Sequence, residues 1–429
     1  MIRASLLAAS AAAIALATPA TAQDFAITNA TVATGDGSAP IANATVVVRG
    51  GRIAAVGAEV RPDPSLPTID GTGLWVTPGL IAAVTTLGLV DVNGVESSND
   101  TSASRARFNA ALDVAPAINP ASQHIKVGRA NGITRAVISG GASNSIFAGQ
   151  GAVIDLGDDP SPVTKAKAFQ MVTLSESGSR IAGGSRKASH AELRNALREA
   201  LDFAAGRWSG EDNLLTRADA EALGPVVAGT QQLFVEAHRA SDIRTVIALG
   251  KEFPRLRLVL VGATEGWLVA QELAASGIPV MAESLQDLPE RFEQIAATQS
   301  NIGRMRAAGV NVSINADSIR FTDHLKQHAG NLVALGRMSG AAGLSWGEAL
   351  ATISSRPAEA VGMGGKIGVL KPGAAGDVVI WDGDPLEVSS GAVQVFIDGV
   401  EQPLDNHRTR LRDRYRDLDE SDLPKAFDW

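Results

Sequence analysis

The sequence of 429 residues contains no cysteine, which excludes disulfides, thiolate nucleophiles and zinc sites built on cysteine. Aromatic residues are also scarce, at 4%, and the formal net charge is −8. Few aromatic side chains and an excess of acidic groups argue against a nucleic-acid-binding surface. We therefore expect no nucleic-acid partner and no fold held together by disulfides.

Long apolar runs are missing beyond the N-terminus, where no stretch reaches the about 18 residues typical of a membrane span. The N-terminus itself has the pattern of a targeting signal. Arg3 precedes an apolar stretch at 4–17, and Ala20, Thr21 and Ala22 form the small-x-small pattern that signal peptidases cleave. A buried N-terminal helix is the alternative. We predict export, to the periplasm in a Gram-negative cell, and no membrane insertion after the signal is removed.

Apolar residues make up 45% of the chain, which is enough for one large core and a smaller one. Alternating strand patterns and turn signals fill the region from 25 to 76 and return from 366 to 399. Between them, short apolar runs alternate with helical stretches, which predicts a parallel sheet covered by helices. A closed (β/α)8 barrel of the TIM type fits this length, with an open doubly wound sheet as the alternative. The pattern between 142 and 223 does not assign the third and fourth strands.

The helical periodicity predicts helices at 191–203, 240–253, 265–275, 302–308, 323–339 and 345–361. The predicted domains are a signal peptide (1–22), the N-terminal part of a β-sandwich (23–77), an α/β barrel (78–362), the C-terminal part of the sandwich (363–405) and a charged tail or helix (406–429).

Two motifs far apart in the chain carry a family resemblance. Residues 70–81 read Asp-Gly-Thr-Gly-Leu-Trp-Val-Thr-Pro-Gly-Leu-Ile, and residues 368–379 read Gly-Val-Leu-Lys-Pro-Gly-Ala-Ala-Gly-Asp-Val-Val. The first resembles the entry into an amidohydrolase barrel, and the second resembles the return strand into the small β-sandwich of that family. The chain is most similar to the exported, imidazolonepropionase-like branch of the amidohydrolases. The resemblance implies one sandwich built from both ends of the chain.

The resemblance also implies a divalent metal at the C-terminal mouth of the barrel, where a metal-bound water attacks a carbonyl-like carbon. The family places His-x-His after strand 1, but this chain has Val84 and Thr86 at the two histidine positions. The strand 6 position also lacks histidine, because residues 261–265 read Val-Gly-Ala-Thr-Glu. The strand 1 metal motif is therefore degenerate.

Two positions of the motif are retained. The resemblance assigns His238 as the strand 5 metal ligand and Asp317 as the strand 8 ligand and general base. The alternatives are a histidine hydrogen-bonded to its neighbours and an aspartate that caps a helix.

Further carboxylates follow the same strands. Glu236 and His238 are two residues apart on one strand and should share its inward face, while Glu265 follows strand 6 and Glu283 ends strand 7. We therefore predict a metal site of His238, Asp317, Glu236 and Glu265, most suited to Zn²⁺ or Mn²⁺. The alternative for Glu265 is a charge at the start of a helix.

Two functions remain open from the sequence. One is a hydrolase of carbon–nitrogen bonds in a small amide, a cyclic amide or a peptide-like substrate, with a metal-activated water. The other is an inactive relative that serves as a binding or partner-docking module. The sequence leaves the substrate and the oligomeric state undecided, and a homo-oligomer is compatible with it.

Overall fold

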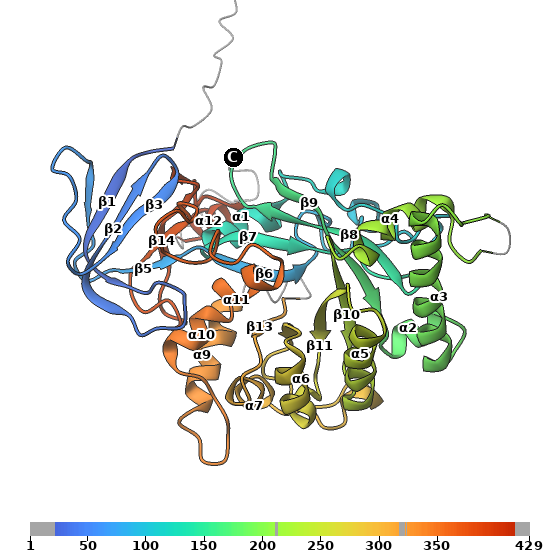
Figure 1. The fold of residues 1–429 in the computed structure, drawn as a ribbon. Helices are drawn as coiled ribbons and strands as arrows, with labels where there is room; N and C mark the ends of the chain where they lie inside the picture. The colour runs from blue at the N-terminus through green and yellow to red at the C-terminus, as the bar shows by residue number, and fades with distance from the viewer. Residues whose placement is uncertain (1–21, 211–212, 317–321, 323, 417–429) are drawn as a thin grey trace, which may run out of the picture.

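The computed structural model describes residues 22–210, 213–316, 322 and 324–416, and it contains two sheets of eight strands each. Strands from both ends of the chain share the first sheet, as the blue and red strands of Figure 1 show. Strand β14 pairs antiparallel with β5, so that Val378 lies opposite Pro78 and Trp381 lies opposite Trp75. The strands of this sheet are β1 (Phe25–Val32), β2 (Ile41–Arg49), β3 (Arg52–Gly57), β4 (Thr68–Asp70), β5 (Trp75–Pro78), β14 (Val378–Trp381), β15 (Ala392–Ile397) and β16 (Val400–Glu401).

The second sheet curls into the predicted barrel. Its strands pair in chain order from β6 to β13. A parallel bridge between Ala83 and Asn315 joins the first strand to the last, and the Ala316 N–H donates to the Ala83 carbonyl at 2.7 Å. The TIM-type barrel beside a small β-sheet domain is thus confirmed. The strands are β6 (Leu80–Thr85), β7 (Ile133–Ile138), β8 (Phe147–Asp155), β9 (Val163–Thr173), β10 (Gln232–Ala237), β11 (Arg257–Gly262), β12 (Val280–Ala282) and β13 (Val312–Ile314).

One barrel strand departs from the expected parallel arrangement. Strand β8 runs antiparallel to both β7 and β9. The connections at 139–146 and 156–162 are shorter than the about twelve residues that a parallel crossover needs. The expectation of a parallel sheet is therefore wrong at the third strand, which lies in the region where the sequence pattern did not assign the strands.

Helices cover the outside of the barrel, and most follow the predicted stretches. The predicted helix at 345–361 is two helices, because Ser354 between them has φ −137° and ψ −88°, outside the helical region. The predicted helix at 265–275 begins as a 3₁₀ turn (Gly266–Val269) before α6. The helices are α1 (Gln123–Ala130), α2 (Glu176–Ile181), α3 (Arg186–Ala204), α4 (Arg217–Val227), α5 (Ala240–Glu252), α6 (Ala270–Ser276), α7 (Asn301–Ala307), α9 (Leu325–Leu335), α10 (Trp346–Ala351), α11 (Ser355–Ala360) and α12 (His407–Arg414).

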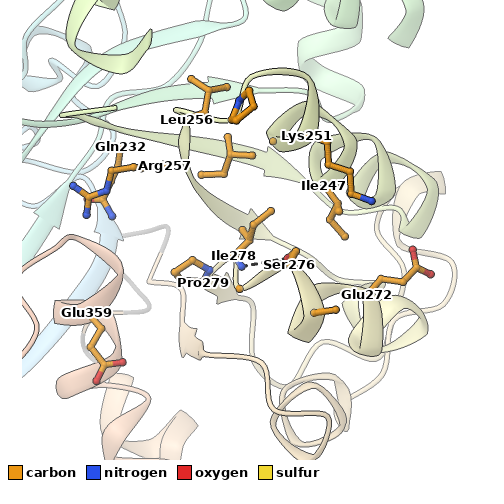
Figure 2. Close-up of a pocket in the computed structure, with 15 residues that line it drawn as sticks. Gln232, Ile247, Lys251, Leu256, Arg257, Glu272, Ser276, Ile278, Pro279 and Glu359 are labelled. Carbon is orange, nitrogen blue, oxygen red and sulfur yellow. Dashed lines mark hydrogen bonds between the residues drawn. The ribbon is translucent and has the colours of Figure 1, made fainter. Parts of the chain in front are cut away.

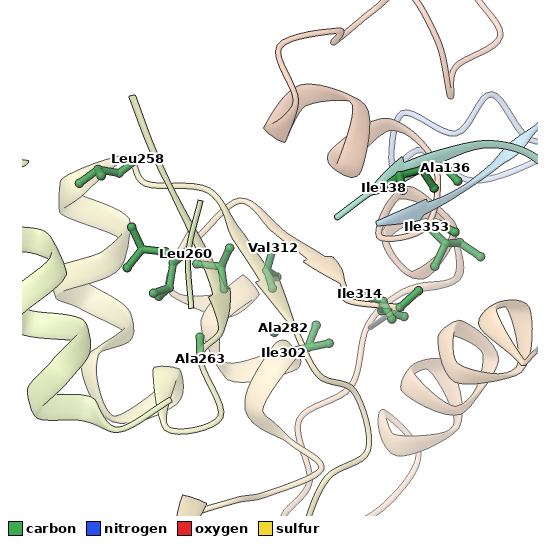
Figure 3. Packing of buried hydrophobic residues seen from close by; sticks show 14 of the residues in the cluster. Ala136, Ile138, Leu258, Leu260, Ala263, Ala282, Ile302, Val312, Ile314 and Ile353 are labelled. Carbon is green, nitrogen blue, oxygen red and sulfur yellow. The ribbon is translucent and has the colours of Figure 1, made fainter. Parts of the chain in front are cut away.

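The strands bury apolar side chains on both faces. Inside the barrel, the rings of Phe169 and Phe234 stack with centroids 4.0 Å apart. Outside it, Leu260 and Val312 belong to the core between strands and helices (Figure 3). The filled interior leaves the strand ends as the places for polar side chains. Within the described ranges, no helix is both long and apolar enough to cross a membrane.

Candidate functional site

His238 lies at the C-terminal mouth of the barrel, directly after β10. Its side chain is 2% exposed, and both ring nitrogens have a partner. Nδ1 lies 2.8 Å from the Thr264 hydroxyl, and Nε2 lies 3.3 Å from Glu236 Oε1. The sequence correctly placed Glu236 and His238 on one face, because alternate residues of a strand point to the same side. It missed Thr264, whose only signal is its position after β11.

The opposite charges of His238 and Glu236 each favour the ionised form of the other. Burial alone would lower the pKa of His238, but the hydrogen bond to Glu236 and the charges of Glu283, Glu236 and Glu293 raise it overall. Burial would raise the pKa of Glu236, but hydrogen bonding and attraction to His238, together with a hydrogen bond from Thr173, lower it overall. The pair is therefore stabilised as an imidazolium beside a carboxylate.

The backbone after β11 makes room for the imidazole. Gly262 has φ +89°, and Ala263 follows with φ +46°. A methyl group on Gly262 would lie 2.5 Å from His238 Cε1. Glycine is thus required both by its left-handed backbone and by the close approach of the ring.

Glu265 has a different set of partners. One carboxylate oxygen accepts the Ala240 N–H at 2.9 Å, and the other accepts the Ala296 N–H at 3.2 Å. Ala240 is the first residue of α5, so the charge also lies at the positive end of a helix. The carboxylate fastens two chain segments together at the edge of the mouth.

A small cavity of about 140 Å³ opens at the same end of the barrel, where β12 and β13 end. Asn315 lines this cavity, and its side-chain oxygen is buried without a hydrogen-bond partner among the described residues. The Thr85 hydroxyl at the end of β6, which is not part of the lining, is likewise buried without a partner there. These groups are available to a ligand that enters the mouth. The cavity is lined by Glu283, Ser284, Gln286, Glu290, Arg291, Gln294 and Asn315.

Glu293, a buried carboxylate that the sequence analysis did not single out, links segments around the mouth of the barrel. Glu293 is fully buried, and its Oε2 accepts the Glu176 N–H at 2.8 Å and a hydrogen bond from Arg186 Nη2 at 3.0 Å. Arg186 also donates to Asp242 at 2.9 Å, which links α3 to the start of α5. Burial is the main cause of the raised pKa of Glu293. Long-range partners of this kind leave no local sequence signal.

Asp317, the predicted general base, lies outside the described residues. Of the other predicted ligands, His238 and Glu236 lie together, while the Glu265 carboxylate is occupied by backbone amides. Among residues 22–210, 213–316, 322 and 324–416, no group of three or more His, Asp or Glu side chains is placed to hold a metal ion. Because His238 also uses both ring nitrogens within the protein, the described residues do not fit an amidohydrolase metal centre.

Known proteins resemble this chain in sequence and in fold. A model of the amidohydrolase family (Amidohydro_3) matches residues 189–401. The amidohydrolase tasK of Hapsidospora irregularis is 22% identical over 370 residues, which cover 78% of this chain and 37% of that protein. The chain thus spans little more than a third of that relative.

Solved structures share the whole architecture. An amidohydrolase from Thermotoga maritima MSB8 superposes with a TM-score of 0.77 at 24% identity, covering 88% of this chain and 99% of that one. A prolidase complexed with N-methylphosphonate-L-proline gives a TM-score of 0.54 at 17% identity, with coverages of 88% and 99%. These likenesses are evidence of the fold. Together with the family match and the barrel closed beside a two-ended β-sheet domain, they establish that the chain belongs to the amidohydrolase superfamily.

Proposed function

We propose that this protein hydrolyses a carbon–nitrogen bond of a small amide, cyclic amide or peptide-like substrate at the mouth that holds His238. The observation that carries the proposal is the pair of buried His238 and partly exposed Glu236, with the ring nitrogen 3.3 Å from the carboxylate. Burying such a pair is costly unless its partners are well placed, so its retention at this mouth suggests a role in the chemistry. The prolidase among the solved neighbours supports a peptide-like substrate.

The proposed chemistry needs a base, a positive charge near the developing oxyanion and a proton for the leaving nitrogen. We assign the base to Asp317 from its position after strand 8. It takes a proton from water, the resulting hydroxide forms the new carbon–oxygen bond, and Asp317 returns the proton as the carbon–nitrogen bond breaks. Because both ring nitrogens of His238 are engaged by Thr264 and Glu236, its imidazolium stabilises the negative charge on the carbonyl oxygen through its positive charge and not as a hydrogen-bond donor. A bound Zn²⁺ or Mn²⁺ would acidify the water, but no step is assigned to it because the described residues do not supply its ligands.

The test is turnover by the purified chain. The panel is N-acyl amino acids, hydantoin-type cyclic amides and dipeptides, with release of the amine followed by mass spectrometry. We expect turnover of one class and a loss of about a hundredfold or more in Asp317→Asn. Asp202→Asn, an exposed aspartate of α3, is the matched control and should keep full activity. Turnover that survives Asp317→Asn, or its absence with every class, would contradict the proposal.

A second candidate is a binding module without catalysis. The observation that favours it is the lack of a metal-ligand cluster among the described residues, together with Val84 and Thr86 at the strand 1 positions. In that case the same compounds would bind in calorimetry without being cleaved. Metal content would separate the candidates further: a stoichiometric ion lost in both His238→Asn and Asp317→Asn favours the hydrolase.

We also propose that the chain is exported to the periplasm. The support is the sequence pattern of Arg3, the apolar stretch 4–17 and the small residues at 20–22. N-terminal sequencing of the protein from cell fractions tests this, and we expect the mature chain to begin at Gln23 in the periplasmic fraction.

A further inference from the structure

A large cavity lies at the opposite end of the barrel from His238. It measures about 740 Å³ and opens between the C-terminal ends of α5 and α6 and the starts of β11 and β12 (Figure 2). One wall is apolar and includes Ile247, Leu256, Ile278 and Pro279. This volume and the mixed lining are typical of a small-molecule site, although a TIM barrel ordinarily carries its chemistry at the other face.

The positive charges of this cavity lack carboxylate partners. Arg257, the first residue of β11, and Lys251 both line it (Figure 2), and within the described part of the chain neither forms an ion pair. The two carboxylates of the wall are already engaged. Glu272 pairs with Arg244 at 2.9 Å, and Glu359 accepts a hydrogen bond from Asn311 Nδ2 at 2.9 Å. Because only Glu272 is neutralised by a cation outside the lining, Lys251 and Arg257 face the single remaining negative charge of Glu359.

A third cation approaches the same point beside Gly362. A methyl group on Gly362 would lie 3.5 Å from Arg257 Nη2, 3.7 Å from Gln232 Oε1 and 3.9 Å from Lys165 Nζ. Burial lowers the pKa of Lys165, and the nearby charges of Arg257 and Lys366 lower it further. Cations that crowd in this way repel one another, and a bound anion would relieve the repulsion.

The carbonyls at the end of helix α11 provide hydrogen-bond partners for only some of the polar side chains beside Gly362. Lys165 Nζ donates to the Val361 carbonyl at 3.0 Å, and Gln232 donates to the Ala360 carbonyl. A cation near the last carbonyls of a helix is stabilising. Arg257 makes no such bond among the described residues, although its guanidinium reaches the same point beside Gly362. Arg257 is exposed, so its charge is met by solvent and is accessible to a ligand.

We propose that this cavity at the N-terminal end of the barrel binds an organic anion. Arg257 of the lining, with Lys165 adjoining it beside Gly362, holds a carboxylate or phosphate head, and the wall of Ile247, Leu256, Ile278 and Pro279 packs against an apolar body. A guanidinium binds such heads through paired N–H donors, and burial of the apolar body adds affinity. The site is separate from the mouth and does not depend on the proposed hydrolysis.

Titration calorimetry of the purified chain tests the site with octanoate, octyl phosphate, inorganic phosphate and octylammonium. We expect both octyl anions to bind and octylammonium not to bind. Arg257→Gln should weaken octyl-anion binding by about tenfold or more, since one charge-assisted contact is removed. Lys165→Gln, which can still donate to Val361, should act in the same direction. Arg61→Gln, an exposed arginine outside the barrel, is the matched control and should bind like the parent chain.

The relative strength of octanoate and octyl phosphate identifies the preferred head. Equal octyl-anion binding by the parent chain and Arg257→Gln would overturn the assignment, as would the absence of binding up to the solubility limit. Tight binding of inorganic phosphate without octyl-anion binding would also overturn it, because the apolar wall would then have no role. Circular dichroism of both variants checks that the fold is intact.

Discussion

Arg135 of β7 and Asp377, one residue before β14, form a buried ion pair that joins the barrel to the β-sheet domain. Arg135 Nε lies 2.7 Å from Asp377 Oδ2, and Nη2 lies 2.8 Å from Oδ1. The two side chains are 3% and 1% exposed. The pairing is bidentate and involves residues 242 positions apart in the chain.

Replacing Arg135 with methionine should lower the free energy of unfolding by about 3–5 kcal/mol, because Asp377 is left as a buried charge without its partner. Urea denaturation measures the change. The control is Arg207→Met, whose pair with Asp202 is 67% and 48% exposed and should cost less than about 1 kcal/mol. Similar small losses in both variants would show that the buried pair does not fasten the two domains.

Stability should fall as the pH rises through the range in which Asp155 ionises. Burial raises the pKa of Asp155 from 3.8 to about 6, so the folded protein holds this proton where the unfolded chain has lost it. Between about pH 4 and 6, the contribution of Asp155 to stability therefore decreases with pH, by an amount on the order of 3 kcal/mol. In Asp155→Asn this decrease should disappear, while Asp202→Asn should keep it. Identical pH profiles of unfolding for the parent and Asp155→Asn would refute the assignment.

Alanine substitutions at two glycines measure how much the close approach of His238 to Gly262 matters for stability. Gly262 and Gly309 have similar φ values of +89° and +93°, but a methyl group added by alanine would meet a side chain within 4 Å only at Gly262, namely His238. Gly309→Ala should cost about 1 kcal/mol from backbone strain. Gly262→Ala should lower the free energy of unfolding by about 1–3 kcal/mol more than Gly309→Ala does, and it should shift the His238 ring signals in NMR spectra. Equal costs would mean that the ring moves aside freely.

Replacing Glu265 tests whether its carboxylate anchors the fold or binds a metal ion. Because its carboxylate accepts two backbone N–H groups, Glu265→Gln should destabilise the fold by about 1–3 kcal/mol. Glu272→Gln, which loses an exposed contact with Arg244, should cost less than about 1 kcal/mol. Metal content measured on both variants completes the test, and a bound ion lost only in Glu265→Gln would restore its role as a ligand.

The fold could be predicted from the sequence because its signals are repeated and local. Apolar strands alternate with helical stretches over the barrel, and the two motifs at 70–81 and 368–379 indicate the shared β-sheet domain. The orientation of β8 could not be predicted in this way. Its first half contains Gly149, Gln150 and Gly151, which do not mark a strand, and only the short connections on either side reveal the reversal.

The site was predictable only along single strands. The spacing of Glu236 and His238 placed both on one face, as found. Their further partners come from other strands and loops, such as Thr264 and Glu293, and no periodicity relates positions so far apart. The Glu265 carboxylate shows the same limit, since its position after β11 does not say which backbone amides it meets.

The sequence by itself indicated the barrel through the alternation of strand and helix patterns, and its resemblance to the amidohydrolases implied that the chain returns to its first sheet. Signals of this kind lie in residue type and spacing, which act within one element or its immediate neighbours. Only the tertiary structure decided that both nitrogens of His238 are taken by Thr264 and Glu236, and that Arg257 and Lys165 converge beside Gly362. Such encounters depend on register, loop path and packing between distant segments, which the order of residues along the chain does not state.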